Sequence, residues 1–316
     1  MRASMGIRWS HDAAIARSIA SDQAWHADGM RLLSDGTASA SARGILAQQG
    51  HNGALGTAAL TDARTGASMP VVIKPPAAQH RQELLAHELL QVAGVDHMIA
   101  PVAARGRETW IGRVPGRSAA EVGIEDARDL VQVAADGYRE RHGLSRAAAT
   151  RRAEDDVATM NALDYVLANF DRKPANLMAE RFTLIDHGHV GFGAMRSGSP
   201  VIPEMNPTFL TPHSPSQALM EAAREAAPMS RAMFNGITLG QAAPEQALVA
   251  VERLAPQAVR DAHRAAAALP PPPGVAPTSA YGRLDAYTVS DAFVEHLLAR
   301  RELLLRTGEF PFVMLL

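Results

Sequence analysis

The feature that most constrains the fold is a set of polar residues at fixed spacing, far apart in the chain. The sequence DRKPAN supplies Asp171, Lys173 and Asn176, and ten residues after Asn176 the sequence IDHG adds Asp186 beside a glycine. Far upstream, Lys74 ends the apolar run VVIK. Carboxylate and amide oxygens are hard ligands of the kind that Mg²⁺ prefers, and lysine is a point charge suited to phosphate. A fold that uses these residues together must bring distant segments to one place.

Composition excludes several classes of protein. The 316 residues are 47% hydrophobic, which suffices for one large domain or a two-lobed one. A net charge of −2 and 5% aromatic residues argue against a nucleic-acid partner, and the absence of cysteine excludes disulfides, thiolate nucleophiles and cysteine-based zinc sites. No window has the roughly 18 apolar residues that a membrane span needs, and residues 1–20 lack a signal-peptide core. We expect a cytoplasmic protein without stable membrane insertion, although export as an effector by a non-classical route stays open.

The hydrophobic pattern predicts strands early in the chain and helices late. Two helices are expected before Gly116, at 10–33 and 79–93, together with short strands near 45–46, 59–61, 70–74, 99–103 and 109–114. Later helices are expected at 125–141, 145–168, 215–227, 244–253, 256–269 and 288–306, with a strand at 182–185 and a proline-rich loop at 193–213. The four prolines at 270–273 suggest either a stiff spacer or a ligand for an aromatic groove.

The motifs resemble those of a known superfamily. DRKPANL resembles the D-x-K-P-x-N-L catalytic loop of Ser/Thr protein kinases. The preceding sequence LDYVLANFDR resembles bacterial phosphatidylinositol 3/4-kinase-like and HipA-like kinases, which often read D-x-x-x-x-N-x-D-R-H; the histidine of that motif is Lys173 here, so its role is not carried over. IDHG resembles the metal-binding D-F-G, with His187 in place of phenylalanine. No A-P-E element follows; the sequence IPE at 202–204 is a faint echo.

The resemblance implies ATP and Mg²⁺ as cofactors and a role for each motif residue. Lys74 would contact the α- and β-phosphates, while Asn176 and Asp186 would hold Mg²⁺. Asp171 would accept a hydrogen bond from the acceptor hydroxyl, and Lys173 would offset charge on the migrating phosphoryl group. Taken alone, the loop could equally be a charged helix end that favours the helix dipole. DHGH could also supply metal ligands for a hydrolase, but no second ligand motif accompanies it.

Two further elements of the nucleotide site are expected in the first half of the chain. GALGTA, with Gly53 and Gly56, resembles the end of the kinase glycine-rich loop, and the sequence DGTAS at 35–39 is a second candidate. Glu88 is preferred as the partner of Lys74, because its distance from the sequence HMI resembles the gap between the helix glutamate and H-P-N-I of protein kinases. Glu83 is the alternative, through a likeness of ELLAH to the E-x-x-A-Y of lipid-kinase-like bacterial proteins. Five residues turn a helix by about 500°, so the two carboxylates should not both reach Lys74.

These observations predict an α+β, bilobal protein-kinase-like fold, with a small antiparallel sheet lobe containing one helix and a larger, mainly helical lobe. The expected divisions are a helical extension at 1–34, a nucleotide-binding sheet lobe at 35–114, and a lobe at 115–316 with the catalytic loop and metal site. Adenine would lie at the link near 113–116. The leading hypothesis is a protein Ser/Thr kinase with a protein substrate. The alternatives are an inositol-lipid or aminoglycoside-like small-molecule kinase and a catalytically inactive pseudokinase.

Overall fold

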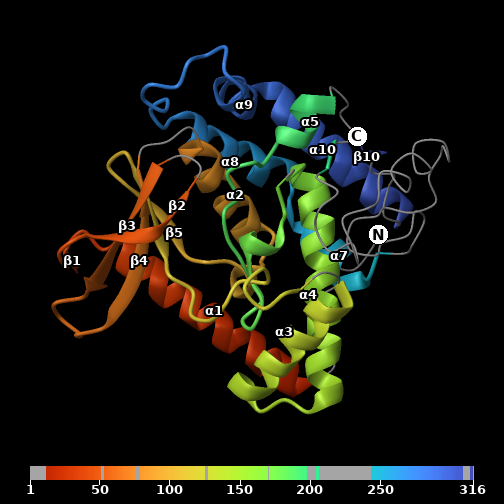
Figure 1. Cartoon of the computed structure of the whole chain (residues 1–316). Helices are drawn as coiled ribbons and strands as arrows, with labels where there is room; N and C mark the ends of the chain where they lie inside the picture. The colour runs from red at the N-terminus through yellow and green to blue at the C-terminus, as the bar shows by residue number, and fades with distance from the viewer. Residues whose placement is uncertain are drawn as a thin grey trace.

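The computed structural model describes residues 12–50, 53–75, 79–124, 127–169, 171–197, 204–205, 243–308 and 314–315. The helix expected at 215–227 and most of the proline-rich loop lie outside these residues. The described chain forms a curled antiparallel sheet beside a larger group of helices (Figure 1). The prediction of an α+β fold with a small sheet lobe and a larger helical lobe is confirmed, and it is the arrangement that the resemblance to kinases implied.

The main sheet has six strands, and every pairing between them is antiparallel. Its order is β1-β3-β4-β6-β5, and β2 also pairs with β3. Alternate residues of β4 are buried, including Val71 and Ile73, so the following Lys74 points to the other face. The strands are β1 (Ser39–Ala40), β2 (Gly44–Gly50), β3 (Gly53–Thr61), β4 (Ser68–Lys74), β5 (Val102–Arg105) and β6 (Glu108–Gly112).

Helix α1 (Ala13–Ser34) crosses both parts of the molecule, as Figure 1 shows in red. Near its start, Ile15 and Ile19 lie in the large core of the helical lobe. At its end, Leu32 and Leu33 pack on the sheet beside residues such as Trp110. Burial of each such side chain contributes roughly 1.5–3 kcal/mol, so α1 stabilises both cores at once.

The helical lobe is built around α4 (Arg146–Leu167), which is buried along most of its length. Helix α2 (His80–Val92) packs between this lobe and the sheet, against α8, α9, β5 and β6. The remaining elements are η1 (Asp96–Met98), α3 (Ala127–His142), η2 (Pro174–Asn176), β7 (Leu177–Met178), β8 (Thr183–Leu184), α5 (Phe192–Ser197), β9 (Glu204–Met205), α7 (Glu245–Arg253), α8 (Pro256–Ala267), α9 (Ala280–Thr288), α10 (Asp291–Thr307) and β10 (Met314–Leu315).

A small hairpin carries the motif residues of the second half. Strands β7 and β8 pair antiparallel, with Leu177 opposite Leu184. The backbone N–H of Ile185 donates to the carbonyl of Asn176 across the hairpin at 3.0 Å. Asn176 and Asp186 therefore leave the same end of one hairpin, although ten residues separate them.

Local expectations agree with the structure in part. The glycine-rich segment from Gly53 is strand β3 rather than a loop, and it forms a hairpin with β2. The helix expected at 288–306 is α10, which begins three residues later, at Asp291. The separate helix α9 before it was not expected; it ends where Ser290 takes an extended conformation and its hydroxyl donates to the carbonyl of Tyr287. Residues 270–273 connect α8 to α9, as a spacer would. Among the described helices, none is both long and apolar enough to cross a membrane.

Candidate active site

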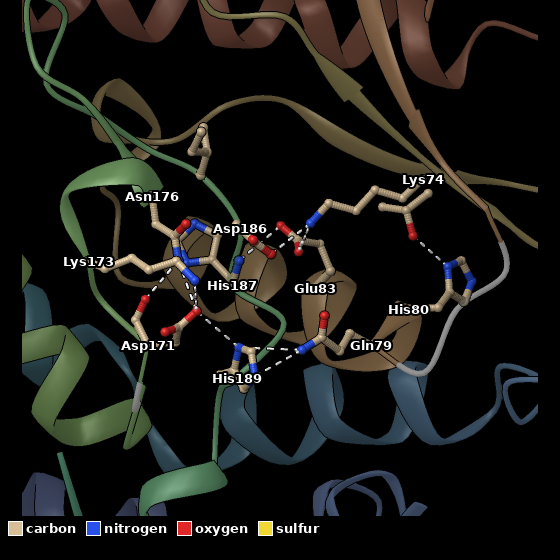
Figure 2. A network of polar contacts seen from close by, with 12 residues as sticks. Lys74, Gln79, His80, Glu83, Asp171, Lys173, Asn176, Asp186, His187 and His189 are labelled. Carbon is tan, nitrogen blue, oxygen red and sulfur yellow. Dashed lines mark hydrogen bonds and ion pairs between the residues drawn. The ribbon is translucent and has the colours of Figure 1, made fainter. Parts of the chain in front are cut away.

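Lys74 stands at the centre of the candidate site, between the sheet and the helical lobe. Its Nζ lies 2.8 Å from Glu83 Oε2 and 2.9 Å from Asp186 Oδ1 (Figure 2). One ammonium therefore joins β4, α2 and the segment after β8. The sequence prediction that Lys74 and Asp186 meet is confirmed.

Glu83, not Glu88, is the partner of Lys74, so the preference for Glu88 is wrong. Glu83 is buried in the first turn of α2, and its second oxygen accepts a hydrogen bond from the backbone N–H of His187 at 3.1 Å. Glu88 lies about 140° further around the helix and is exposed. The glutamate that faces the site thus holds Lys74 and also fixes the backbone beside Asp186.

Burial and charge oppose each other at this site, and charge prevails. Burial disfavours the charged form of Lys74, but the Glu83 and Asp186 carboxylates raise its pKa above the ordinary value. Burial likewise favours the neutral acid at Asp186, but the Lys74 ammonium lowers the pKa of Asp186 below its usual range. Both groups are charged at neutral pH. Asp186 also has a positive φ of 55°, a strained conformation for a residue with a side chain.

The catalytic-loop residues form a second group beside the first. Lys173 Nζ lies 2.9 Å from Asp171 Oδ2. Asn176 Nδ2 donates to the backbone carbonyl of Asp171 at 2.7 Å and lies 3.3 Å from Oδ2 of the same residue. The structure thus brings Asp171, Lys173 and Asn176 together as predicted, and the turn of η2 makes the contact possible.

Sequence reasoning assigned no role to Arg172, which is the scaffold of the loop. This buried guanidinium makes two hydrogen bonds to Asp164, at 2.9 and 3.1 Å, and donates to the carbonyls of Asn176 and Ile185. Asp164 also accepts from the side chain of Asn169 at 2.9 Å. The D-x-x-x-x-N-x-D-R pattern is therefore a structural ring that joins the end of α4 to both motif loops. The pattern was visible in the sequence, but its partners were not.

His187 and His189 lie on either side of Gly188, in different surroundings. His187 is buried, and its Nδ1 lies 3.3 Å from the Arg172 guanidinium. His189 Nδ1 lies 3.4 Å from Asp171 Oδ2, and its Nε2 lies 3.2 Å from the side-chain amide nitrogen of Gln79. The sequence reasoning considered this histidine only as a possible metal ligand and did not single out Gln79.

The glycines predicted to approach phosphate lie on the strand beside Lys74. Gly53 pairs with Gly50 at the turn between β2 and β3, and Gly56 pairs with Ile73, the residue before Lys74. Their contact with phosphate stays a prediction. At the competing candidate, 35–39, Asp35 Oδ1 accepts from the backbone N–H of Thr37 at 2.8 Å, so the turn is closed by its own carboxylate.

The residues present fit a magnesium ion held jointly with phosphate. The Asn176 side chain uses its nitrogen for Asp171, which leaves its carbonyl oxygen as a ligand, and Asp186 uses one carboxylate oxygen for Lys74. Mg²⁺ commonly takes one or two protein oxygens and completes its shell with substrate phosphates and water. Within the described residues, no three His, Asp or Glu side chains are grouped to hold a metal by themselves.

Comparisons with known proteins give no match by sequence, but they find a similar solved structure. No protein-family model matches the sequence, and the search of curated proteins gives no match. Among solved structures, the chain is similar to the Helicobacter pylori proinflammatory kinase CtkA, with 12% identity over 83% of this chain and 96% of that chain, at a TM-score of 0.40.

Proposed function

We propose that the chain is an ATP- and Mg²⁺-dependent phosphotransferase that moves the γ-phosphate of ATP to a Ser or Thr hydroxyl of a protein. The observation that carries the proposal is the position of Lys74, between Glu83 and Asp186 at 2.8 and 2.9 Å. Phosphoryl transfer relies on positioning and charge stabilisation rather than on a covalent intermediate, and this site consists of such groups.

Lys74 is the proposed ligand of the α- and β-phosphates. An ammonium has three N–H donors, and in the described part of the chain Glu83 and Asp186 take two of them. The third donor is left for a phosphate oxygen. The Lys74 side chain is 22% exposed and that of Asp186 is 40% exposed, so a ligand can reach both.

Asp186 and Asn176 are the proposed magnesium ligands, through a carboxylate and an amide carbonyl oxygen. The ion, when bound, supplies positive charge that neutralises the phosphates. Lys74 keeps the Asp186 carboxylate ionised and oriented. Arg172 fixes the Asn176 backbone from the opposite side, since its guanidinium donates to the Asn176 carbonyl at 3.0 Å.

Asp171 is the proposed acceptor of the substrate hydroxyl proton, and Lys173 is the proposed counter-charge for the transferring group. The two side chains are in contact at 2.9 Å, and that of Lys173 is about one-third exposed. A carboxylate within hydrogen-bond reach of the hydroxyl both orients it and takes up its proton as the new P–O bond forms.

Adenine is proposed to lie beside the link at 113–116. Val114 belongs to a small apolar cluster with Val102 and Ile111, and the partly exposed Met178 and Ile185 pack against it. Ile185 directly precedes Asp186, so an apolar surface adjoins the proposed phosphate site. A flat purine ring placed there would pack against these apolar side chains.

A protein acceptor is proposed in preference to a lipid. The D-x-x-x-x-N-x-D-R pattern shared with lipid-kinase-like proteins is explained by the contacts of Arg172 with Asp164, and those contacts concern folding rather than the acceptor. The Asp171 and Lys173 pair follows the protein-kinase loop.

The test is incubation of the purified chain with γ-labelled ATP, Mg²⁺ and separate pools of protein, lipid and aminoglycoside, followed by mapping of phosphosites. We expect label on protein Ser or Thr, and its loss in Asp171→Asn and Asp186→Asn variants that remain folded by circular dichroism. Label confined to lipid or aminoglycoside would overturn the choice of acceptor. Wild-type transfer rates in both variants would overturn the assignment of the site.

A further inference from the structure

Every contact that the structure gives the Asp171 side chain falls on one of its two oxygens. Lys173 Nζ at 2.9 Å, Asn176 Nδ2 at 3.3 Å and His189 Nδ1 at 3.4 Å all approach Oδ2. Within the described residues, no hydrogen bond reaches Oδ1. One oxygen is therefore anchored, while the other is available to an acceptor hydroxyl, and His189 is the only one of the three anchors that lies outside the catalytic loop.

His189 is itself oriented by the N-cap residue of α2, Gln79. The Gln79 amide nitrogen lies 3.2 Å from His189 Nε2 and 3.3 Å from Nδ1 (Figure 2). The ring of Phe192 meets the imidazole edge-on at 5.6 Å, and that of Tyr281 lies 6.0 Å away. The imidazole is thus held on several sides, in a position where its Nδ1 faces Asp171.

The neighbouring Asp171 carboxylate favours one of the two neutral forms of His189. Burial lowers the pKa of His189 below its ordinary value, although the Asp171 and Asp186 carboxylates oppose the shift, so the ring is neutral at pH 7. The Gln79 amide nitrogen lies within 3.3 Å of both ring nitrogens and can donate to whichever carries no proton. The Asp171 carboxylate only accepts, so its oxygen 3.4 Å from Nδ1 favours the ring with its proton on Nδ1 and Nε2 left to accept from Gln79.

Glycine at position 188 leaves the space that the Gln79 side chain needs to reach His189. A Cβ at this position would lie 2.7 Å from Gln79 Cδ and 2.8 Å from Gln79 Cβ, closer than real contacts allow. Glycine therefore lets the Gln79 side chain pass over the backbone to reach His189. This requirement for glycine comes from the Gln79 side chain and is independent of metal binding by Asp186.

We propose that Gln79 and His189 are positioning residues, which orient the Asp171 carboxylate for the acceptor hydroxyl and link it to helix α2. This inference rests on the proposed phosphotransferase function and deepens it. Gln79 is the N-cap residue of α2 and lies four residues before Glu83. The N-terminal end of this helix therefore contacts the acceptor side through His189 and the nucleotide side through Lys74. A displacement of α2 would disturb both sides together.

The kinetic test uses the full chain, γ-labelled ATP, Mg²⁺ and a heat-inactivated lysate containing protein and lipid as the acceptor pool. We expect Gln79→Leu and His189→Leu to lower the rate at saturating ATP by about 10–100-fold, with the KM for ATP within about twofold of wild type because Lys74, Glu83 and Asp186 are untouched. His189→Asn, which keeps a donor near the Nδ1 position, should retain more activity than His189→Leu. The double variant should be no slower than His189→Leu alone, because the two residues act as one unit.

The control is Gln91→Leu, the same substitution at a half-buried position further along α2, which should transfer at the wild-type rate. A wild-type rate in Gln79→Leu, or losses that multiply in the double variant, would overturn the inference. Gly188→Ala should reproduce the loss seen in Gln79→Leu, since it displaces the same side chain.

A spectroscopic measurement keeps the inference separate from the proposed function. In wild-type protein with ¹⁵N-labelled histidine, the His189 signal, assigned by its absence in His189→Asn, should be that of a neutral ring protonated on Nδ1, and Gln79→Leu should change it. A ring protonated on Nε2, or a charged ring, would overturn the inference even if transfer occurs. If the wild type gives the expected signal but transfers no phosphate, the proposed function is wrong. The contact between His189 and Asp171 would then be present without a catalytic role.

Discussion

Two networks of charged side chains join the parts of this molecule, and they differ in their access to solvent. The site network consists of Lys74, Glu83 and Asp186, and leaves 22% of the lysine and 40% of the Asp186 side chain exposed. The buried network joins α1, α3 and α4, and the charged side chains at its centre are at most 3% exposed. The centre of the buried network consists of Asp22, His97, Tyr138, Arg152 and Asp156, and at its rim the less buried Arg141, His142 and Arg181 also contact Asp22.

The buried network satisfies its own charges. The Arg152 guanidinium lies 2.6 Å from Asp22 and 3.5 Å from Asp156, and stacks 3.8 Å from the ring centre of Tyr138. Asp156 also contacts the Tyr138 hydroxyl and His97. Among the described residues, these buried groups are in contact with one another, and the contacts fix α1 against α3 and α4. The site network, by contrast, leaves a lysine donor and a carboxylate oxygen for a ligand.

When each network loses its cation, we expect mainly a loss of stability in the buried network and mainly a loss of activity in the site network. The largest expected change in stability follows Arg152→Met, which removes the buried cation that Asp22 and Asp156 share. We expect the free energy of unfolding to fall by roughly 3 kcal/mol, because two buried carboxylates lose a charged partner, although Arg141, His142 and Arg181 still contact Asp22. Urea denaturation measures the change, and Arg139→Met at an exposed pair is the control, with an expected loss below about 1 kcal/mol. Equal losses in both variants would contradict the structural role of the buried network.

Lys74→Met is the matching change in the site network. We expect phosphoryl transfer to fall by about 10²–10³-fold, which is the usual effect of removing a group that stabilises charge in the transition state. The free energy of unfolding should fall by less than in Arg152→Met, because Asp186 is 40% exposed and the buried Glu83 keeps the backbone N–H of His187 as a donor. Transfer assays and urea denaturation on the same preparation separate the two effects. A Lys74→Met variant that is strongly destabilised but transfers phosphate at the wild-type rate would contradict the expected role of the site network.

A smaller effect distinguishes the two glutamates of α2. Glu83→Gln should lower the transfer rate by about 10–100-fold, because Lys74 and the backbone of His187 lose a charged partner. Glu88→Gln, an identical substitution on an exposed position of the same helix, should have no measurable effect on rate and change stability by less than about 0.5 kcal/mol. Steady-state transfer rates of the two variants show which glutamate supports Lys74. A loss of rate in Glu88→Gln alone would favour Glu88, as the sequence analysis did.

The smallest expected effect concerns acid stability where α1 meets α2. His26 and His87 lie with their Nε2 atoms 3.1 Å apart, and burial lowers the pKa of His26 to about 4 and that of His87 to about 3. Because an unfolded histidine titrates near pH 6.5, the unfolded state binds more protons between pH 6.5 and 4, and stability falls as pH falls through this range. Between pH 7 and pH 5, the free energy of unfolding of His87→Leu should therefore fall by roughly 1–2 kcal/mol less than that of the wild type, as measured by urea denaturation. Parallel losses in the two proteins would show that His87 is not buried as a neutral ring.

The fold class and the meeting of Lys74 with Asp186 could be predicted from sequence, because hydrophobic periodicity and motif order carry that information. The choice between Glu83 and Glu88 could not, because the rotation of α2 about its axis is set by packing on α8 and α9. The position of α1 was also hidden, since Asp22 and His26 resemble surface residues until their partners from α2 and α4 are known. Arg172, Gln79 and His189 likewise acquire their roles only from residues brought close by the tertiary fold.

The convergence of the four residues Lys74, Asn176, Asp186 and Asp171 on one nucleotide is the central claim. Calorimetric titration of the purified chain with ATP, with and without Mg²⁺, tests it most directly, beside the Asp186→Asn variant. We predict that Mg²⁺ strengthens ATP binding by the wild type at least about tenfold, and that Asp186→Asn loses this gain because it loses the carboxylate ligand. Binding of ATP that is indifferent to Mg²⁺, or an undiminished Mg²⁺ effect in the variant, would contradict the claim.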